Sequence, residues 1–127
     1  MIFDSDILIE FLGKNPAAAA CIESVPLMDR NLSAMSYLEV LYGCRNRREL
    51  HDFQQFAGTS LAEVVPISES ISHKAVQIME GYVLASRLDA TDALIAATAL
   101  VRAEPLATGN VKHFDFIAGL ELKAFRP

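Results

Sequence analysis

Met1-Ile2-Phe3-Asp4 opens the chain with three apolar residues that lead directly into an acid. Such a run predicts a short buried strand with a carboxylate at its end. A buried carboxylate is costly unless it is paired with another group or bound to a metal ion. These residues therefore predict a strand of the sheet and, at its end, a candidate functional group.

Further short apolar runs alternate with segments of helical periodicity. We expect strands at 31–34, 62–67, 105–107 and 122–125, and helices around 8–12, 17–22, 35–44, 48–56, 75–82 and 93–103. In the helix at 35–44 the apolar face is expected to carry Leu38, Leu41 and Tyr42, and Ala93–Ala103 is apolar nearly all round, which predicts a buried helix. This alternation predicts an α/β sandwich with a largely parallel sheet. No linker or repeat interrupts it, so residues 1–127 are expected to form a single domain.

The composition is typical of a globular protein, with 127 residues of which 52% are apolar. Cys21 and Cys44 are the only cysteines and have no metal-binding spacing, so we expect two reduced thiols. Three acids among the first ten residues argue against a signal peptide, and no apolar run approaches the roughly 20 residues of a membrane span. We therefore expect a soluble, cytoplasmic protein without a membrane partner.

The net charge of −5 argues against binding nucleic acid by bulk electrostatics. It does not exclude a nuclease, because an acidic metal site contributes much negative charge and its ions reverse the local sign. The one basic run contains Arg45, Arg47 and Arg48. It is either a solvated helix face or a contact for phosphate or for an acidic partner.

Acidic and polar residues follow the predicted strands. In an open α/β sheet, ligands bind beyond the carboxyl ends of the strands. There we expect Asp4-Ser5-Asp6, Asp92 and Thr108-Gly109-Asn110 to converge. Crowded carboxylates repel one another unless a cation joins them, and Mg²⁺ or Mn²⁺ prefers oxygen ligands. Such a site favours metal-dependent phosphodiester hydrolysis.

Two of the candidate acids have ordinary structural interpretations as well. Asp92 lies three residues after Asp89, which is also the spacing of a helix capping box. Ser36, Glu39 and Gly43 form a narrow polar stripe that faces either water or the cleft. The spacing alone does not decide between these interpretations.

Four blocks of the chain resemble those of PIN-domain proteins, especially VapC-type toxins. They occur in the same order and cover essentially the whole chain: Phe3-Asp4-Ser5-Asp6-Ile7-Leu8-Ile9, Ser33-Ala34-Met35-Ser36-Tyr37-Leu38-Glu39-Val40-Leu41-Tyr42-Gly43, Thr91-Asp92-Ala93-Leu94-Ile95-Ala96-Ala97-Thr98-Ala99-Leu100 and Thr108-Gly109-Asn110-Val111-Lys112-His113-Phe114. The resemblance implies a three-layer α/β/α fold and a Mg²⁺- or Mn²⁺-dependent endoribonuclease. It also implies a homodimeric toxin that acts on RNA and is neutralised by a cognate antitoxin protein.

By the same resemblance, the catalytic residues are Asp4, Glu39 and Asp92. Asp4 and Asp92 would be the principal metal ligands, Glu39 would bind the metal directly or through water, and Thr108 would hydrogen-bond near the site. Asp6 is expected to orient Asp4 or to cap the first helix.

The chain departs from the family near the turn at 108–110. A fourth acid is frequent there, and this chain has Asn110, which leaves the number of metal ions open. Asp115 is a candidate compensating ligand. Lys112 and His113 are expected either to begin a surface helix or to contact a phosphate.

Two other functions compete with this interpretation. Asp4-x-Asp6 also resembles the opening of haloacid-dehalogenase-type phosphatases, although Leu8 stands where that family has threonine. The other alternative is a catalytically degenerate PIN fold that binds partners.

Overall fold

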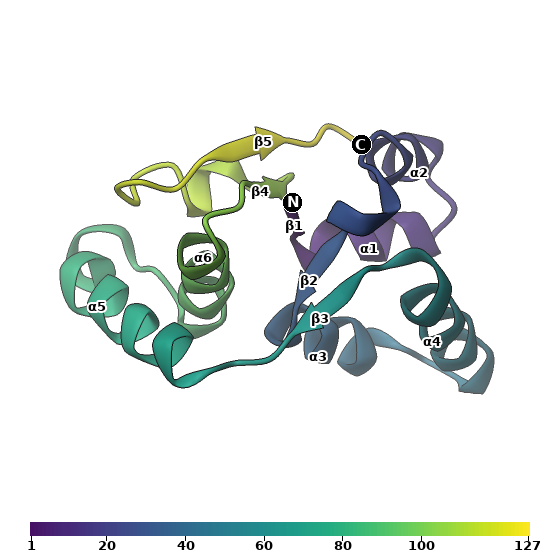
Figure 1. Cartoon of the computed structure of the whole chain (residues 1–127), viewed down its shortest axis with the longest axis horizontal. Helices are drawn as coiled ribbons and strands as arrows, with labels where there is room; N and C mark the ends of the chain where they lie inside the picture. The colour runs from purple at the N-terminus through teal and green to yellow at the C-terminus, as the bar shows by residue number, and fades with distance from the viewer.

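The computed structural model describes residues 1–127 as a five-stranded sheet with helices on both sides (Figure 1). The strands are β1 Ile2–Phe3, β2 Asn31–Ser33, β3 Glu63–Val65, β4 Leu106–Thr108 and β5 Leu122–Ala124. The α-helices are α1 Ser5–Leu12, α2 Pro16–Glu23, α3 Ala34–Gly43, α4 Arg47–Ser60, α5 Glu69–Ser86 and α6 Ala90–Arg102, and the short 3-10 helices are η1 Leu27–Asp29 and η2 Val111–His113.

The strand order is β3-β2-β1-β4-β5, and every neighbouring pair is parallel. The chain builds the sheet outward from β1 to β3 on one side and then returns to β1 to add β4 and β5 on the other. The order therefore reverses between β1 and β4. In open α/β sheets this switch point is where ligands bind, beyond the carboxyl ends of the strands.

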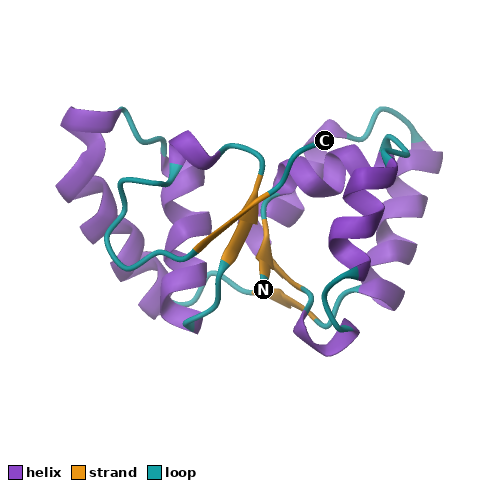
Figure 2. Cartoon of the chain, turned by 90° about the horizontal axis from the view of Figure 1, so that it is seen from above, coloured by secondary structure: helices purple, strands orange, loops and turns teal.

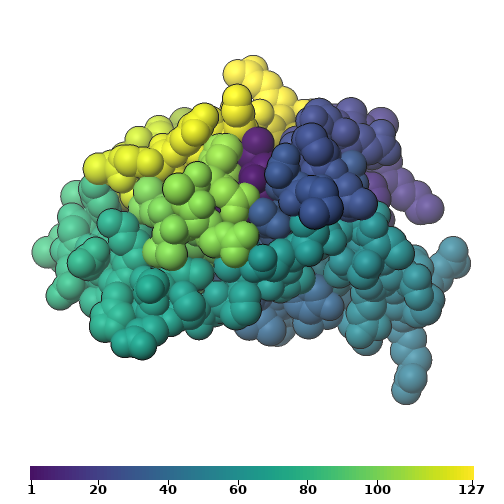
Figure 3. Space-filling model, viewed as in Figure 1, coloured from purple at the N-terminus to yellow at the C-terminus, as the bar shows by residue number.

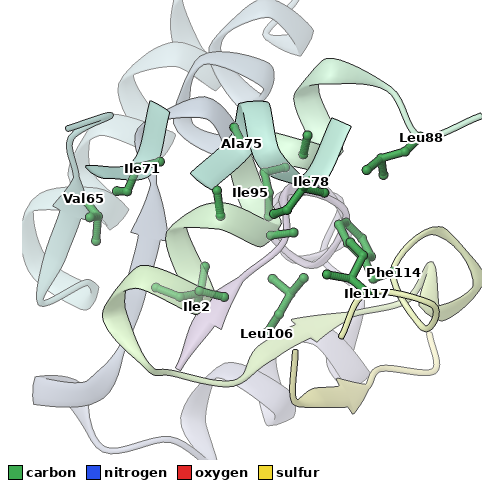
Figure 4. Packing of buried hydrophobic residues seen from close by; sticks show 14 residues of the cluster. Ile2, Val65, Ile71, Ala75, Ile78, Leu88, Ile95, Leu106, Phe114 and Ile117 are labelled. Atoms are coloured by element: carbon green, nitrogen blue, oxygen red, sulfur yellow. The ribbon is translucent and has the colours of Figure 1, made fainter. Parts of the chain in front are cut away.

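The helices form two layers with the sheet between them (Figure 2). Ile2 and Leu106 point into a core shared with α5 and α6, while Phe3 and Ala107 point into a core shared with α1, α2, α3 and α4. Figure 4 shows the first of these cores, in which Ile95 lies among the α5 residues Ile71, Ala75 and Ile78. The predicted three-layer sandwich with a mainly parallel sheet is confirmed.

Several element boundaries follow from local signals that the sequence carries. Asn15 caps α2 just before Pro16, Asn46 caps α4 and Asp89 caps α6, each through its side-chain oxygen. The predicted burial of α6 is confirmed for its middle, because all residues from Ile95 to Ala99 are buried, whereas Val101, Arg102 and Ala103 are exposed.

The expected apolar face of α3 is wrong for two of its three residues, since only Leu41 is partly buried and packs against the core. Leu38 and Tyr42 are exposed to 53% and 95%, and the helix buries Ser36 and Val40 instead. These two pairs are offset by two residues, which is about 200° around a helix, so they lie on opposite faces. The small Ser36 faces the protein, and two large apolar side chains face outward.

Other boundaries also differ from the prediction, most of all in α5, which runs from Glu69 to Ser86 rather than from 75 to 82. The β3 strand is limited to Glu63–Val65, whereas α4 continues to Ser60. Thr108 is the last residue of β4 rather than the first residue of a turn. It is fully buried, so its hydroxyl faces the protein interior.

At the amino end of β1, polar contacts hold the start of the chain in place. The amino group of Met1 donates to Glu104 Oε1 at 2.6 Å and to the backbone oxygen of Asp29 at 3.0 Å. Figure 3 shows the first residues between the segment that follows α6 and the segment around η1. None of the helices has the length and apolar character needed to cross a membrane.

Candidate functional site

Asp4 lies at the switch point, directly after β1 and at the N-cap of α1. Its backbone N–H donates to Ala107 of β4, which fixes the residue against the neighbouring strand. Its carboxylate accepts from Ser5 N through Oδ1 at 2.7 Å and from Thr108 Oγ1 through Oδ2 at 2.7 Å. The side chain is almost completely buried and held on both oxygens.

Glu39 reaches the same place from α3. The Ser5 hydroxyl donates to Glu39 Oε1 at 3.0 Å and lies 3.4 Å from Asp4 Oδ1. Ser5 therefore links two carboxylates that are 35 positions apart in the sequence. Glu39 is half-buried, and the face of α3 that carries it together with the buried Ser36 turns toward Asp4.

Asp92 joins the site from the first turn of α6. The capping oxygen belongs to Asp89, which accepts from Asp92 N at 2.8 Å. The Asp92 carboxylate does not return this bond to the Asp89 backbone. It lies 3.1 Å from Nδ1 of His113 instead.

Asp6 fastens the loop that follows β4. Its Oδ2 accepts from Gly109 N at 2.8 Å and from Asn110 Nδ2 at 3.3 Å, and its Oδ1 is buried without a hydrogen-bond partner. A Cβ at Gly109 would stand 2.7 Å from Asp6 Oδ2, so the carboxylate or the loop would have to shift to admit a larger residue. The α1 cap is Asp4, so the capping role expected for Asp6 is wrong.

The remaining candidates lie apart from these acids. Asp115 is exposed, and no hydrogen bond or ion pair joins it to Asp4, Glu39 or Asp92. In the basic run, Arg45 pairs with Glu49 at 2.7 Å, and Arg47 and Arg48 are exposed.

Burial and crowding disfavour the charged form of the acids nearest β1. Burial raises the pKa of Asp4 above its ordinary value, although hydrogen bonds from Thr108 and Ser5 oppose the shift. Burial, reinforced by the charge of Asp4, raises the pKa of Asp6 to about 6. The two carboxylates lie close enough for the charge of Asp4 to act on Asp6.

The acids from α3 and α6 show the same effect. Burial, together with the charges of Asp4 and Asp89, raises the pKa of Glu39. Burial, the charge of Asp89 and then that of Asp4 raise the pKa of Asp92 to about 6, and His113 opposes the shift. Asp4 is the charge that Asp6, Glu39 and Asp92 all feel, so it is the electrostatic centre of the site.

The residues present fit a hard divalent cation by the chemistry of their donors. In this structure no three His, Cys, Asp or Glu side chains are already grouped to hold a metal ion. The converging donors are nevertheless carboxylate oxygens, which Mg²⁺ and Mn²⁺ prefer. Their raised pKa values show that a nearby positive charge would stabilise the ionised forms, and Asp6 keeps one buried oxygen free.

Comparison with the models of known protein families finds one that matches this chain. The family model of the PIN domain covers residues 1–119 of the chain. This chain belongs to the PIN-domain family. The resemblance found in the sequence is thereby confirmed, and the haloacid-dehalogenase-type alternative is removed. No functionally curated protein matches the chain.

Solved structures of similar proteins share the fold over nearly the whole chain. A toxin–antitoxin complex from Klebsiella pneumoniae is 28% identical, with a TM-score of 0.74 and coverage of 94% of this chain and 93% of that one. FitAcB from Neisseria gonorrhoeae is 25% identical, with a TM-score of 0.76 and coverage of 99% and 96%. DNA-bound VapBC from Salmonella typhimurium, at 18% identity, has a TM-score of 0.83 and coverage of 97% and 96%.

Two further residues of this PIN domain take part in the site. Ser5 was not among the candidates, and His113 was expected to begin a surface helix or to contact a phosphate, not to contact Asp92. Ser5 lies within the quoted Asp4-Ser5-Asp6 stretch, and its hydroxyl could have been noticed beside two acids. His113 contacts Asp92 from 21 positions away, and that contact exists only once β4 and α6 are packed together. The sequence signal for His113 was its place just after the Thr108-Gly109-Asn110 turn.

Proposed function

We propose that this PIN-domain protein is a metal-dependent endoribonuclease and the toxin of a toxin–antitoxin pair. The observation that supports this most is the placement of Asp4 at the switch point, where its charge acts on Asp6, Glu39 and Asp92 together. Acids that disfavour one another's ionisation, at the position where an open α/β sheet binds ligands, suit a cationic cofactor and an anionic substrate.

The proposed cofactor is Mg²⁺ or Mn²⁺, held by Asp4 and Asp92, with Glu39 binding directly or through water. When bound, such an ion lowers the pKa of a water molecule and neutralises charge on a phosphate. The chain itself supplies orientation. Thr108 and the backbone N–H of Ser5 fix the two oxygens of Asp4, and the Ser5 hydroxyl sets the position of Glu39.

The direct test is cleavage of a mixed cellular RNA pool by the antitoxin-free chain, with Mg²⁺ or Mn²⁺ against EDTA. We expect metal-dependent cleavage that falls at least 100-fold in Asp4→Asn, because one donor oxygen and one charge are lost. Asp29→Asn is the matched control, since Asp29 is exposed and lies at the other end of the sheet. Cleavage of single-stranded DNA of similar length, measured in the same way, tests whether the chain prefers RNA.

Two outcomes would count against the proposal. If folded wild-type chain cuts no RNA with either ion, the catalytically degenerate, partner-binding PIN fold becomes the better account. If Asp4→Asn cuts as well as the wild type does, hydrolysis is centred elsewhere.

The proposed antitoxin partner has a suitable surface beside the site. A hollow of about 450 Å³ is lined by Ser5, Ile9, Met35, Leu38, Glu39 and Tyr42, so apolar side chains extend directly from the acids. Ile9, Leu38 and Tyr42 are exposed to between 51% and 95%, which is unusual for large apolar residues. A partner seated there would also cover Glu39 and block the site.

We expect Tyr42→Asp to weaken antitoxin binding, measured by co-purification and calorimetry with the co-expressed antitoxin, while RNA cleavage by the free chain continues. Met28→Asp is the matched control, because Met28 is 81% exposed in η1, apart from the acids and from α5. Equal loss of antitoxin binding in both variants would argue against this surface.

We also propose a homodimer. The α5 residues Val76, Val83 and Leu84 are exposed apolar side chains spaced by seven and eight positions, so they fall along one stripe of the helix. A second copy would bury this stripe. Sedimentation velocity over a range of concentrations tests this, and a monomer at all concentrations would refute it.

A further inference from the structure

Asp92 and Asp4 differ in how firmly their carboxylates are held. Asp4 accepts hydrogen bonds on both oxygens, from Ser5 and from Thr108. The Asp92 carboxylate has a single hydrogen-bond contact, which joins its Oδ2 to Nδ1 of His113 at 3.1 Å. No other hydrogen bond selects the orientation of this carboxylate.

His113 comes from a segment that is itself fixed. Asp6 accepts from Gly109 and Asn110, and Thr108 Oγ1 accepts from Asn110 N at 3.0 Å. The backbone N–H of His113 donates to the oxygen of Asn110 at 2.9 Å. The next residue, Phe114, is fully buried and anchors η2 to the core. The imidazole is therefore presented to Asp92 by a braced loop.

The ring itself contributes little to the core. The His113 side chain is 57% exposed, whereas that of Asp92 is 17% exposed. A role in packing would require a buried His113 side chain, because buried side chains contribute most of the packing energy. The contact with Asp92 is the most specific interaction that this side chain makes.

We infer that His113 is a positioning residue, whose Nδ1–H holds the Asp92 carboxylate in the orientation in which it binds the cation together with Asp4. The inference rests on the proposed function, since it concerns the same metal site. Carboxylates that ligate a metal are commonly hydrogen-bonded by a further residue, and loss of such a partner typically lowers metal affinity 10- to 100-fold. His113 has that relation to Asp92.

The test is calorimetric titration of the full chain with Mn²⁺, which needs no RNA substrate. We expect His113→Ala to bind Mn²⁺ roughly 10- to 100-fold more weakly than wild type. His113→Asn should recover most of the affinity, because the asparagine Nδ2 occupies nearly the position of the histidine Nδ1. His113→Gln should not, because its amide reaches the position of Nε2 instead.

His73→Ala is the matched control. His73 lies on α5, is 75% exposed and pairs with Glu69 at 3.5 Å, so the same kind of side chain and contact is removed away from the site. We expect its Mn²⁺ affinity to equal that of the wild type. Thermal unfolding followed by circular dichroism should show all four variants folded, because both imidazoles are largely exposed.

Each outcome decides the matter. Unchanged Mn²⁺ affinity in His113→Ala would overturn the inference and leave the proposed function standing. Better recovery by glutamine than by asparagine would also overturn it, because His113 would then act directly through Nε2. If the wild-type chain binds no Mn²⁺, the proposed metal site fails, and the inference fails with it.

Discussion

Asp4 and Asp6 are two positions apart in the sequence and have different roles. Asp4 lies between β1 and β4 and is held by Ser5 and Thr108, whereas Asp6 binds the loop that follows β4. One carboxylate therefore faces the proposed chemistry, and the other shapes the loop beside it. The two are close enough for the charge of Asp4 to raise the pKa of Asp6.

The raised pKa values make the stability of the fold depend on pH. Asp6 and Asp92 have a pKa of about 6 in the folded chain against 3.8 in the unfolded chain. Between these values the folded state binds more protons, so stability falls as pH rises from about 4 to 6. Above that window both states are ionised and the loss is complete.

We therefore expect the chain in EDTA to be more stable at pH 5 than at pH 7.5, by about 1 to 3 kcal/mol. Urea unfolding at the two pH values measures the difference. Asp92→Asn should reduce it, because one of the titrating groups is removed. A stability that rises steadily from pH 5 to pH 7.5 would contradict these shifts.

Gly109 is the residue that permits Asp6 to hold the loop. We expect Gly109→Ala to lower the free energy of unfolding by about 1 to 2 kcal/mol, because its Cβ would stand 2.7 Å from Asp6 Oδ2 and displace a charge-assisted hydrogen bond. Gly81→Ala is the control. It lies inside α5 with no atom within 4 Å of the added Cβ, and should stabilise by up to about 1 kcal/mol. Equal effects of the two substitutions in urea unfolding would refute this role.

At the level of elements, the sequence predicts what is encoded locally. Asn15 and Pro16 mark the start of α2 because capping and the fixed φ of proline act within one turn. Which face of α3 is buried depends on where α6 and β2 lie, and the pattern of Leu38 and Tyr42 does not contain that information. The contact between His113 and Asp92 depends on tertiary packing for the same reason.

The last turn of α6 offers a test of helix termination. Ala103 caps this helix with φ 53°, a left-handed conformation that costs an L-residue roughly 1 to 2 kcal/mol. We expect Ala103→Gly to stabilise the fold by about 0.5 to 1 kcal/mol. Glycine removes the conformational cost in the folded state, but its greater freedom in the unfolded chain offsets part of that gain. Ala20→Gly, at an exposed position within α2, should instead destabilise by about 1 kcal/mol. Destabilisation by both, measured in urea, would contradict the cap geometry.

The whole molecule places its candidate site where its two halves meet. The α1–α4 layer supplies Asp4 and Glu39, and the α5–α6 layer supplies Asp92, with β1 and β4 between them. The convergence of strand ends could be expected from the sequence, because parallel strands bring their carboxyl ends to one edge. The hollow along α1 and α3 could not be expected from the sequence, because it depends on which helix faces remain uncovered.

Because the site joins both layers, a cation bound there should stabilise the fold as a whole. A ligand that binds only the folded state at 100 times its dissociation constant adds about 2.7 kcal/mol. For a chain of this size we expect Mn²⁺ to raise the unfolding temperature by roughly 5 to 15 °C at pH 7.5. Scanning calorimetry with Mn²⁺, and with KCl at equal ionic strength, measures this effect. Asp4→Asn should start from an equal or higher unfolding temperature, because repulsion among the acids is relieved, and should gain little from Mn²⁺. An equal gain in wild type and Asp4→Asn would place the bound ion on the general acidic surface, away from the junction of the two layers.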